Sequence, residues 1–166
     1  MEILLEKETS TLLEESIKLE ESIKETLETF GIMDIQNIRL VKGPVDFPGK
    51  YFVSSIGFVG DYTGLISLYC SGDLYVHIAE CMLGSKIDDV DEEVRDALGE
   101  LTNLVVGTFK SKLGTDKQPF KQSIPAVIDG NDFTTNHFDL KNNKLFACNG
   151  GQHTLYVQLT FKNKSK

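Results

Sequence analysis

VRDALGELTNLVVGTFKSKL, residues 94–113, spaces its apolar residues at the three- and four-residue intervals of an α-helix. On a helical projection these residues gather on one side, which carries Val94, Leu98, Leu101, Val105 and Phe109. The opposite side carries, within roughly 60° of arc, Asp96, Glu100, Asn103 and Gly107. The stretch therefore predicts a helix that packs one face on a core. Its other face turns a carboxylate and an amide, one helical turn apart, away from that core.

We expect this helix to run from Asp88 to Lys112. Acidic residues crowd its predicted first turn and lysines stand in its last turn, an arrangement that complements the helix dipole. Gly114 then supplies a stop. The helix also contains Gly99 and Gly107, and each glycine costs roughly 1 kcal/mol relative to alanine. We therefore expect close packing, or the close approach of another molecule, at these glycines.

The rest of the chain alternates helical and β-rich segments. Residues 10–30 predict a second long helix. A short helix that carries Leu74, Ile78 and Met82 is predicted between a Ser71-Gly72-Asp73 cap and Gly84. Strands are predicted at 35–41, 51–58, 64–70, 124–128, 144–148 and 154–161, with two hairpins among them. This order predicts an α+β fold, with a mostly antiparallel or mixed sheet and long helices packed on one face. Each half runs helix, strand and hairpin, which suggests an internal pseudo-duplication.

The composition indicates one soluble domain over residues 1–166, in which residues 1–9 form a loose extension or extra turns of the first helix. The formal net charge is −8, which disfavours nucleic acid and anionic membranes as partners. The sequence shows neither a secretory signal pattern nor a long apolar segment. Three cysteines without CxxC spacing are typical of reduced thiols, so a cytoplasmic location is expected.

A metal site is the main alternative that the residues raise outside the long helix. Cys70, His77 and Cys81 contain donor atoms that zinc accepts, and His77 and Cys81 stand one helical turn apart. A fourth ligand is not evident, and zinc sites usually show more closely spaced pairs. We therefore expect these residues to pack in the fold, and we expect no metal.

One string of residues in the predicted helix is more specific. Asp96-x-x-x-Glu100-x-x-Asn103, followed by Val106-Gly107 and later by Pro125, resembles the active-site signature of the CheC/CheX/FliY family. Members of that family dephosphorylate the chemotaxis response regulator CheY. Similar segments occur in the family's order at 54–57, 64–68, 82–84 and 123–130, so the resemblance covers about residues 20–161. It implies a CheC-like fold and a phosphatase, a hydrolase of chemotaxis or related two-component signalling.

The resemblance also implies roles for single residues. Asn103 would orient the attacking water, and Glu100 would pair with the active-site lysine of the regulator. Asp96 would support Glu100 or the interface, and Gly107 would let the regulator's loops approach. The first long helix contains no Glu-x-x-Asn, so one active site is expected, as in CheX-like members.

The partner implied by the resemblance is a phosphorylated CheY-like response regulator. The regulator would supply a magnesium ion in its own active site, and this chain would bind no cofactor itself. CheX relatives can form homodimers, so a homodimer is also allowed. The family often has Asn-Ala after the glycine, whereas this chain has Thr108-Phe109. That departure keeps open a second hypothesis, a non-catalytic adaptor domain that binds a response regulator.

Overall fold

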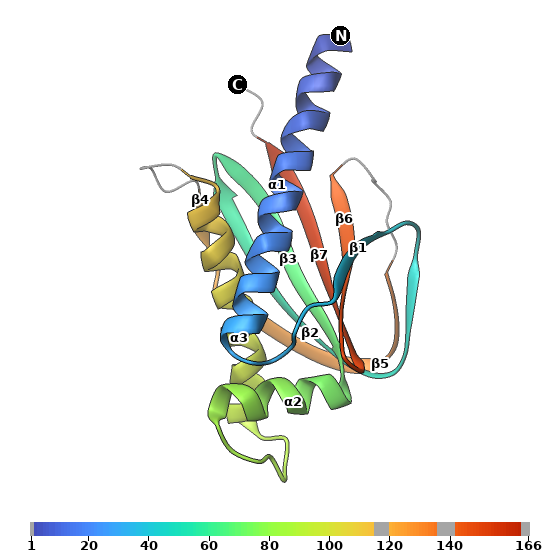
Figure 1. Cartoon of the computed structure of the whole chain (residues 1–166), viewed down its shortest axis with the longest axis vertical. Coiled ribbons are helices and arrows are strands. Elements are labelled where there is room, and N and C mark those ends of the chain that lie inside the picture. Colours follow the sequence, from blue (N-terminus) through green and yellow to red (C-terminus); the bar gives the residue numbers. More distant parts are fainter. Residues whose placement is uncertain (1, 115–119, 136–141, 164–166) are drawn as a thin grey trace.

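The computed structural model describes residues 2–114, 120–135 and 142–163. Along this part of the chain one helix precedes three strands, and two helices then precede four strands; Figure 1 shows their arrangement. The helices are α1 (Glu2–Thr29), α2 (Gly72–Leu83) and α3 (Glu92–Lys112). The strands are β1 (Asn37–Val41), β2 (Val45–Gly60), β3 (Tyr62–Ser71), β4 (Phe120–Gln122), β5 (Ala126–Thr135), β6 (Asn143–Gly150) and β7 (His153–Asn163).

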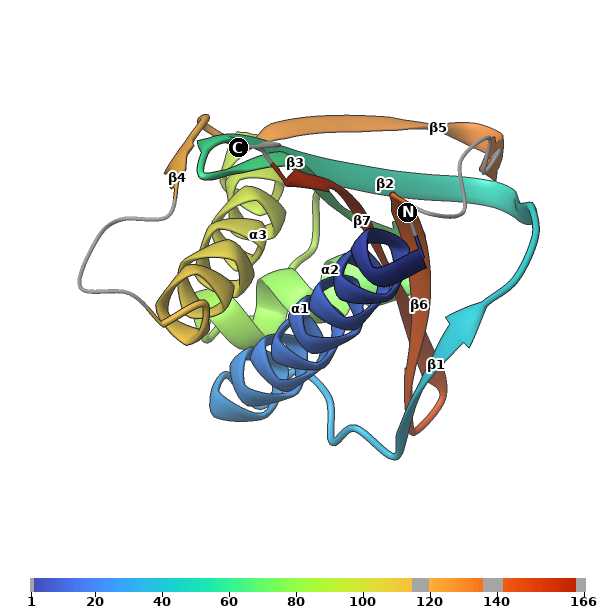
Figure 2. The same ribbon diagram turned by 90° about the horizontal axis from the view of Figure 1, so that it is seen from above.

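The strands form one antiparallel sheet in the order β1-β6-β7-β3-β2-β4. Strand β5 also pairs with β2, so β2 has β3 along one edge and both β4 and β5 along the other. The sheet curves strongly, and α1 and α3 lie side by side against its concave face (Figure 2). Helix α2 crosses one end of this layer (Figure 1). The predicted α+β fold with long helices on one face is confirmed.

The core lies between the concave face of the sheet and the helices. Successive strand residues point to opposite faces, so β2 buries alternate residues against the helices, namely Phe52, Ile56 and Phe58. Helix α1 adds Leu19, Ile23 and Leu27, all fully buried. The apolar stripe predicted for α3 faces the same core, and none of its five residues is more than 2% exposed. Burial of this stripe fixes which face of α3 remains outside.

The predicted start of α3 at Asp88 is wrong, because the helix begins at Glu92. Asp91 is its N-cap: its backbone is extended, and its carboxylate accepts a hydrogen bond of 3.1 Å from the Val94 amide. The sequence offers several acidic caps in a row, and their pattern alone does not separate them. The predicted end at Lys112 is confirmed.

The other differences concern length and pairing. Residues 2–9 are helical, which is the second of the two expected alternatives. Strands β2 and β5 extend beyond their predicted ends because Val45–Phe47 pairs with Phe133–Thr135 across a register shift at Pro48-Gly49. Strand β4 was not predicted. None of the helices in the described ranges has the length and apolar character to span a membrane. The suggested internal duplication stays a prediction.

Candidate active site

Helix α3 brings the four predicted site residues to one face outside the core. The side chains of Asp96 and Glu100 are exposed, and Asn103 and Gly107 are half-buried. Their helix neighbours on the other face are buried, since the apolar stripe packs on the sheet. The arrangement therefore offers a carboxylate and an amide, one turn apart, to another molecule.

Two carboxylates, Asp96 and Glu100, stand one turn apart on this face. Like charges at this spacing repel each other mildly, so the pair attracts a cation more strongly than one carboxylate would. Asn103 follows with an uncharged amide, which can both donate and accept hydrogen bonds. The face therefore combines an acidic end with a neutral polar end.

Gln122 was missed by the sequence analysis. Its side chain lies at this face, where its Nε2 donates a hydrogen bond of 2.7 Å to Oδ1 of Asn103. Gln122 is the last residue of β4, a strand of three residues that pairs with the end of β2. A strand this short carries no periodic signal, and its partner lies about sixty positions earlier in the chain, so only the fold brings Gln122 to Asn103.

The two glycines of α3 differ in their surroundings. A Cβ on Gly99 would lie 3.2 Å from Cγ of Pro125, so Gly99 permits close packing of the segment before β5 on the helix. Apart from the backbone of α3 itself, a Cβ on Gly107 would meet no atom of the described residues within 4 Å. Contacts within the described part of the chain thus account for Gly99, whereas Gly107 faces open space beside Asn103.

Polar contacts tie α3 to the sheet behind the site. The hydroxyl groups of Thr102 and Ser54, on α3 and β2, form a buried hydrogen bond of 2.7 Å. Arg95 Nη2 lies 3.0 Å from Oδ1 of Asp129 on β5, and Lys50 on β2 binds the second carboxylate oxygen. The Lys50 ammonium, and then the Arg95 guanidinium, lower the pKa of Asp129. These contacts fix the orientation of the helix face that carries Glu100 and Asn103.

The residues considered as metal ligands are engaged in the fold. Cys70 is fully buried, and burial raises the pKa of its thiol far above the ordinary value. His77 Nε2 lies 2.7 Å from the carbonyl oxygen of Ile32, and Cys81 Sγ donates a bond of 3.6 Å to the carbonyl of Gly31. Among the described residues, no group of three or more His, Cys, Asp or Glu side chains is placed to hold a metal ion.

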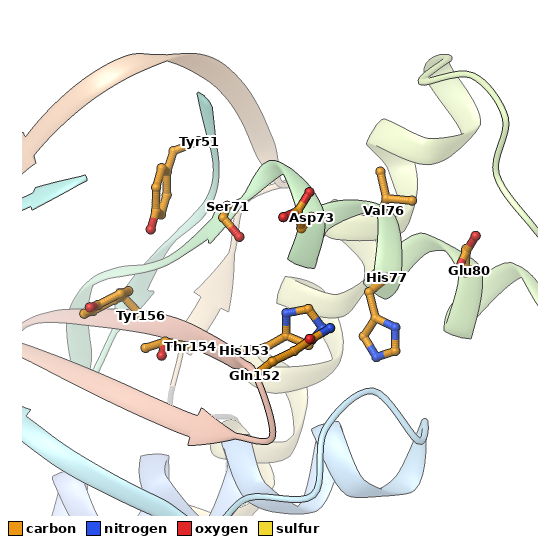
Figure 3. A pocket seen from close by; sticks show the side chains of 10 residues that line it. All are labelled: Tyr51, Ser71, Asp73, Val76, His77, Glu80, Gln152, His153, Thr154 and Tyr156. Carbon is orange, nitrogen blue, oxygen red and sulfur yellow. The ribbon is translucent and has the colours of Figure 1, made fainter. Parts of the chain in front are cut away.

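A pocket of about 540 Å³ lies elsewhere, between α2 and the turn that joins β6 to β7 (Figure 3). The imidazole rings of His77 and His153 stack at its edge, with centroids 5.0 Å apart. Burial, and then the nearby His77, lower the pKa of His153. None of the predicted catalytic or partner-binding residues lines this pocket. Its lining consists of Tyr51, Ser71, Asp73, Val76, His77, Glu80, Gln152, His153, Thr154 and Tyr156.

Comparison with known proteins places these features in a family. The sequence profile of the family described as chemotaxis phosphatase CheX matches residues 52–148, which is more than half of the chain and includes Glu100 and Asn103. No curated protein gives a significant match by sequence.

Solved structures share the fold. The chemotaxis protein CheX of Desulfovibrio desulfuricans is 19% identical with a TM-score of 0.74, and the match covers 90% of this chain and 99% of that one. A CheC-like superfamily protein of Shewanella sp. PV-4 is 25% identical with a TM-score of 0.72, over 90% of this chain and 98% of that one. A chain of the CheX–CheY–BeF3–Mg complex of Borrelia burgdorferi is 16% identical with a TM-score of 0.62, over 88% and 96%. These likenesses show the shared fold, and the profile match shows that this chain belongs to the CheX family of chemotaxis phosphatases.

Proposed function

We propose that this chain is a phosphatase that hydrolyses the aspartyl phosphate of a CheY-like response regulator. Membership of the CheX family supports the activity class. The observation that carries the residue assignment is the pairing of an exposed Glu100 with a half-buried Asn103, one turn apart on a helix face that the fold leaves open.

Asn103 holds the attacking water in this proposal. Hydrolysis of an acyl phosphate needs a water in line with the scissile P–O bond, while positive groups balance the charge on the phosphoryl oxygens. An amide can orient water through its donors and its acceptor, and it brings no negative charge toward the phosphoryl group. Positioning of this kind can lower a barrier by several kcal/mol.

Glu100 anchors the regulator in this proposal by pairing with its active-site lysine. A carboxylate–ammonium hydrogen bond is charge-assisted and becomes stronger when docking removes water from it. Asp96, one turn earlier, adds negative charge at the same end of the face. Gly107 leaves open space on the other side of Asn103, where a loop of the regulator could approach closely.

The partner is a CheY-like receiver in this proposal. The complex of CheX with CheY from Borrelia burgdorferi supports this assignment, because its CheX chain shares the fold of this chain. We propose that the regulator supplies a magnesium ion in its own active site and that this chain adds no metal ion. A homodimer stays a further proposal.

Thr108-Phe109 bears on the second hypothesis, an adaptor without catalysis. Phe109 is fully buried in the core and is unable to touch a partner, whereas Thr108 is half-buried. Only one of the two unusual residues therefore reaches the surface. The phosphatase is the better supported of the two functions.

A phosphate-release assay with several phosphorylated CheY-like receivers tests the proposal. We expect the wild-type chain to accelerate phosphate loss from at least one receiver. Glu100→Ala should weaken both the acceleration and the binding, since it removes the anchor, while Glu28→Ala on the exposed face of α1 should change neither. Tight binding with an unchanged rate of phosphate loss would favour the adaptor.

A further inference from the structure

The amide of Asn103 is already engaged before any partner binds. A side-chain amide can turn either its oxygen or its nitrogen toward a given direction, and the two orientations offer opposite hydrogen-bonding groups. Gln122 Nε2 donates to Asn103 Oδ1 over 2.7 Å. We propose that Gln122 is a positioning residue for dephosphorylation, which holds this amide in one orientation. The inference rests on the proposed function.

The backbone around Gln122 is fixed on the sheet side. Gln122 lies opposite Phe58 in the β2–β4 pairing. The next residue, Ser123, donates its amide to the carbonyl of Gly57 over 2.8 Å, and its hydroxyl accepts from the Gly57 amide over 3.1 Å. Two residues earlier, the buried ring of Phe120 packs on Phe58 with centroids 4.6 Å apart. Gln122 therefore projects from a backbone that is anchored on both sides.

The two elements that carry the amides are also joined independently of the amides. Pro125 packs on Gly99, one turn before Asn103 on α3. The neighbour of Asn103, Thr102, is held by its buried bond to Ser54 of β2. The Gln122–Asn103 bond is thus not needed to assemble the site. Its effect is on the orientation of the Asn103 side chain, and loss of the Gln122 side chain should leave the backbone in place.

The orientation matters because of what the attacking water requires. Water presents a lone pair to phosphorus when an acceptor takes one of its hydrogens, and a carbonyl oxygen can serve as that acceptor. Oδ1 has two lone pairs, so one can bind Gln122 while the other binds water. A reversed amide would present N–H donors to the water and misdirect its lone pair. Gln122 supplies the restraint without adding charge beside the phosphoryl group.

Two substitutions in the full chain test this role. Gln122→Met keeps the length of the side chain and removes the donor. Asn103 must then be ordered during the reaction, and the cost of ordering one such side chain corresponds to about three- to tenfold. We expect a loss of that size in the stimulated dephosphorylation rate. Affinity for a beryllofluoride-activated receiver and the urea midpoint should be unchanged. Gln122→Glu should cost more than the Met variant, because a carboxylate accepts from Asn103 Nδ2 and reverses the amide. Gln152→Met, the same change on an exposed turn, should have no effect.

The NMR signals of the Asn103 side-chain NH2 group provide a second readout without any receiver. Both Gln122 variants should shift these signals, and Gln152→Met should not. Unchanged Asn103 signals, or wild-type rates in both Gln122 variants, would overturn the proposal. A loss of receiver affinity equal to the loss of rate would also overturn it, since Gln122 would then be a docking residue. If the wild-type chain accelerates no receiver, the proposed function fails, while the NMR comparison still decides whether Gln122 orients Asn103.

Discussion

The substitution Gly107→Ala distinguishes the effect of this position on the stability of the fold from its proposed contact with a loop of the regulator. Beyond the backbone of α3, a methyl group at this position would meet no atom within 4 Å in the part of the chain that the structure describes, so the substitution introduces no clash there. Alanine is favoured over glycine in a helix interior by about 1 kcal/mol. We therefore expect Gly107→Ala to raise the free energy of unfolding by about that amount, which corresponds to a rise in Tm of about 2–4 °C for a chain of this size.

The same substitution should impair activity. If a regulator loop docks against Gly107, the added methyl group overpacks the interface, and overpacking typically costs about 1–3 kcal/mol. That range corresponds to about a five- to 150-fold loss of affinity for the activated receiver. Urea unfolding measures the first effect, and receiver binding with phosphate release measures the second.

Gly99→Ala is the matched control on the same helix. Its methyl group would lie 3.2 Å from the ring of Pro125, and a strain of about 1–3 kcal/mol there offsets or exceeds the gain in helix propensity. We expect this variant to be less stable than Gly107→Ala. A Gly107→Ala variant that is stabilised and yet binds and dephosphorylates its receiver normally would refute the close approach at Gly107. A destabilised Gly107→Ala variant would refute the open space itself.

Three further predictions concern the scaffold. Asp129 has a lowered pKa because of Lys50 and Arg95. Its contribution to stability is therefore present above the unfolded pKa of about 3.9 and is lost as pH falls from that value through the lower pKa of the folded state. Asp129→Asn should therefore narrow the difference in urea midpoint between neutral and acidic pH, and an unchanged difference would contradict this. Thr102→Val should destabilise the fold by about 1–3 kcal/mol because it leaves the Ser54 hydroxyl buried without its partner. Adding Ser54→Ala should recover part of that loss in the free energy of unfolding. Strictly additive losses in the double variant would count against an energetic coupling between the two hydroxyl groups. Burial raises the pKa of the Cys148 thiol to about 12 and also shields the Cys70 thiol from reagents. A thiol reagent should therefore label the native chain at Cys81 alone. Rapid labelling that persists in the Cys81→Ser variant would disprove this.

The helix that carries the site could be predicted from the sequence because the residues that determine it are close together in the chain. The apolar stripe recurs every three or four residues, and the polar face follows from the same geometry. Its exact start was missed because several neighbouring aspartates can each cap a helix, and the hydrogen bond that selects Asp91 is visible only in the structure. Likewise, the extension of β2 and β5 depends on pairing between segments about ninety residues apart.

The candidate site was only partly predictable for the same reason. Asp96, Glu100, Asn103 and Gly107 lie on one helix, so their spacing alone groups them on one face. Gln122 reaches Asn103 only because the three-residue strand β4 pairs with the end of β2. The sequence raised two explanations for the glycines, and the structure assigns Gly99 to packing on Pro125.

The rate of phosphate loss from a phosphorylated receiver with Asn103→Ala tests the central claim most directly. Removal of the amide should abolish the stimulated rate, since no other group is proposed to orient the water, while affinity for the activated receiver stays close to that of the wild-type chain. Asn131→Ala, at an exposed position of β5, serves as the control and should retain the full rate. An Asn103→Ala variant that still accelerates phosphate loss as the wild-type chain does would contradict the account.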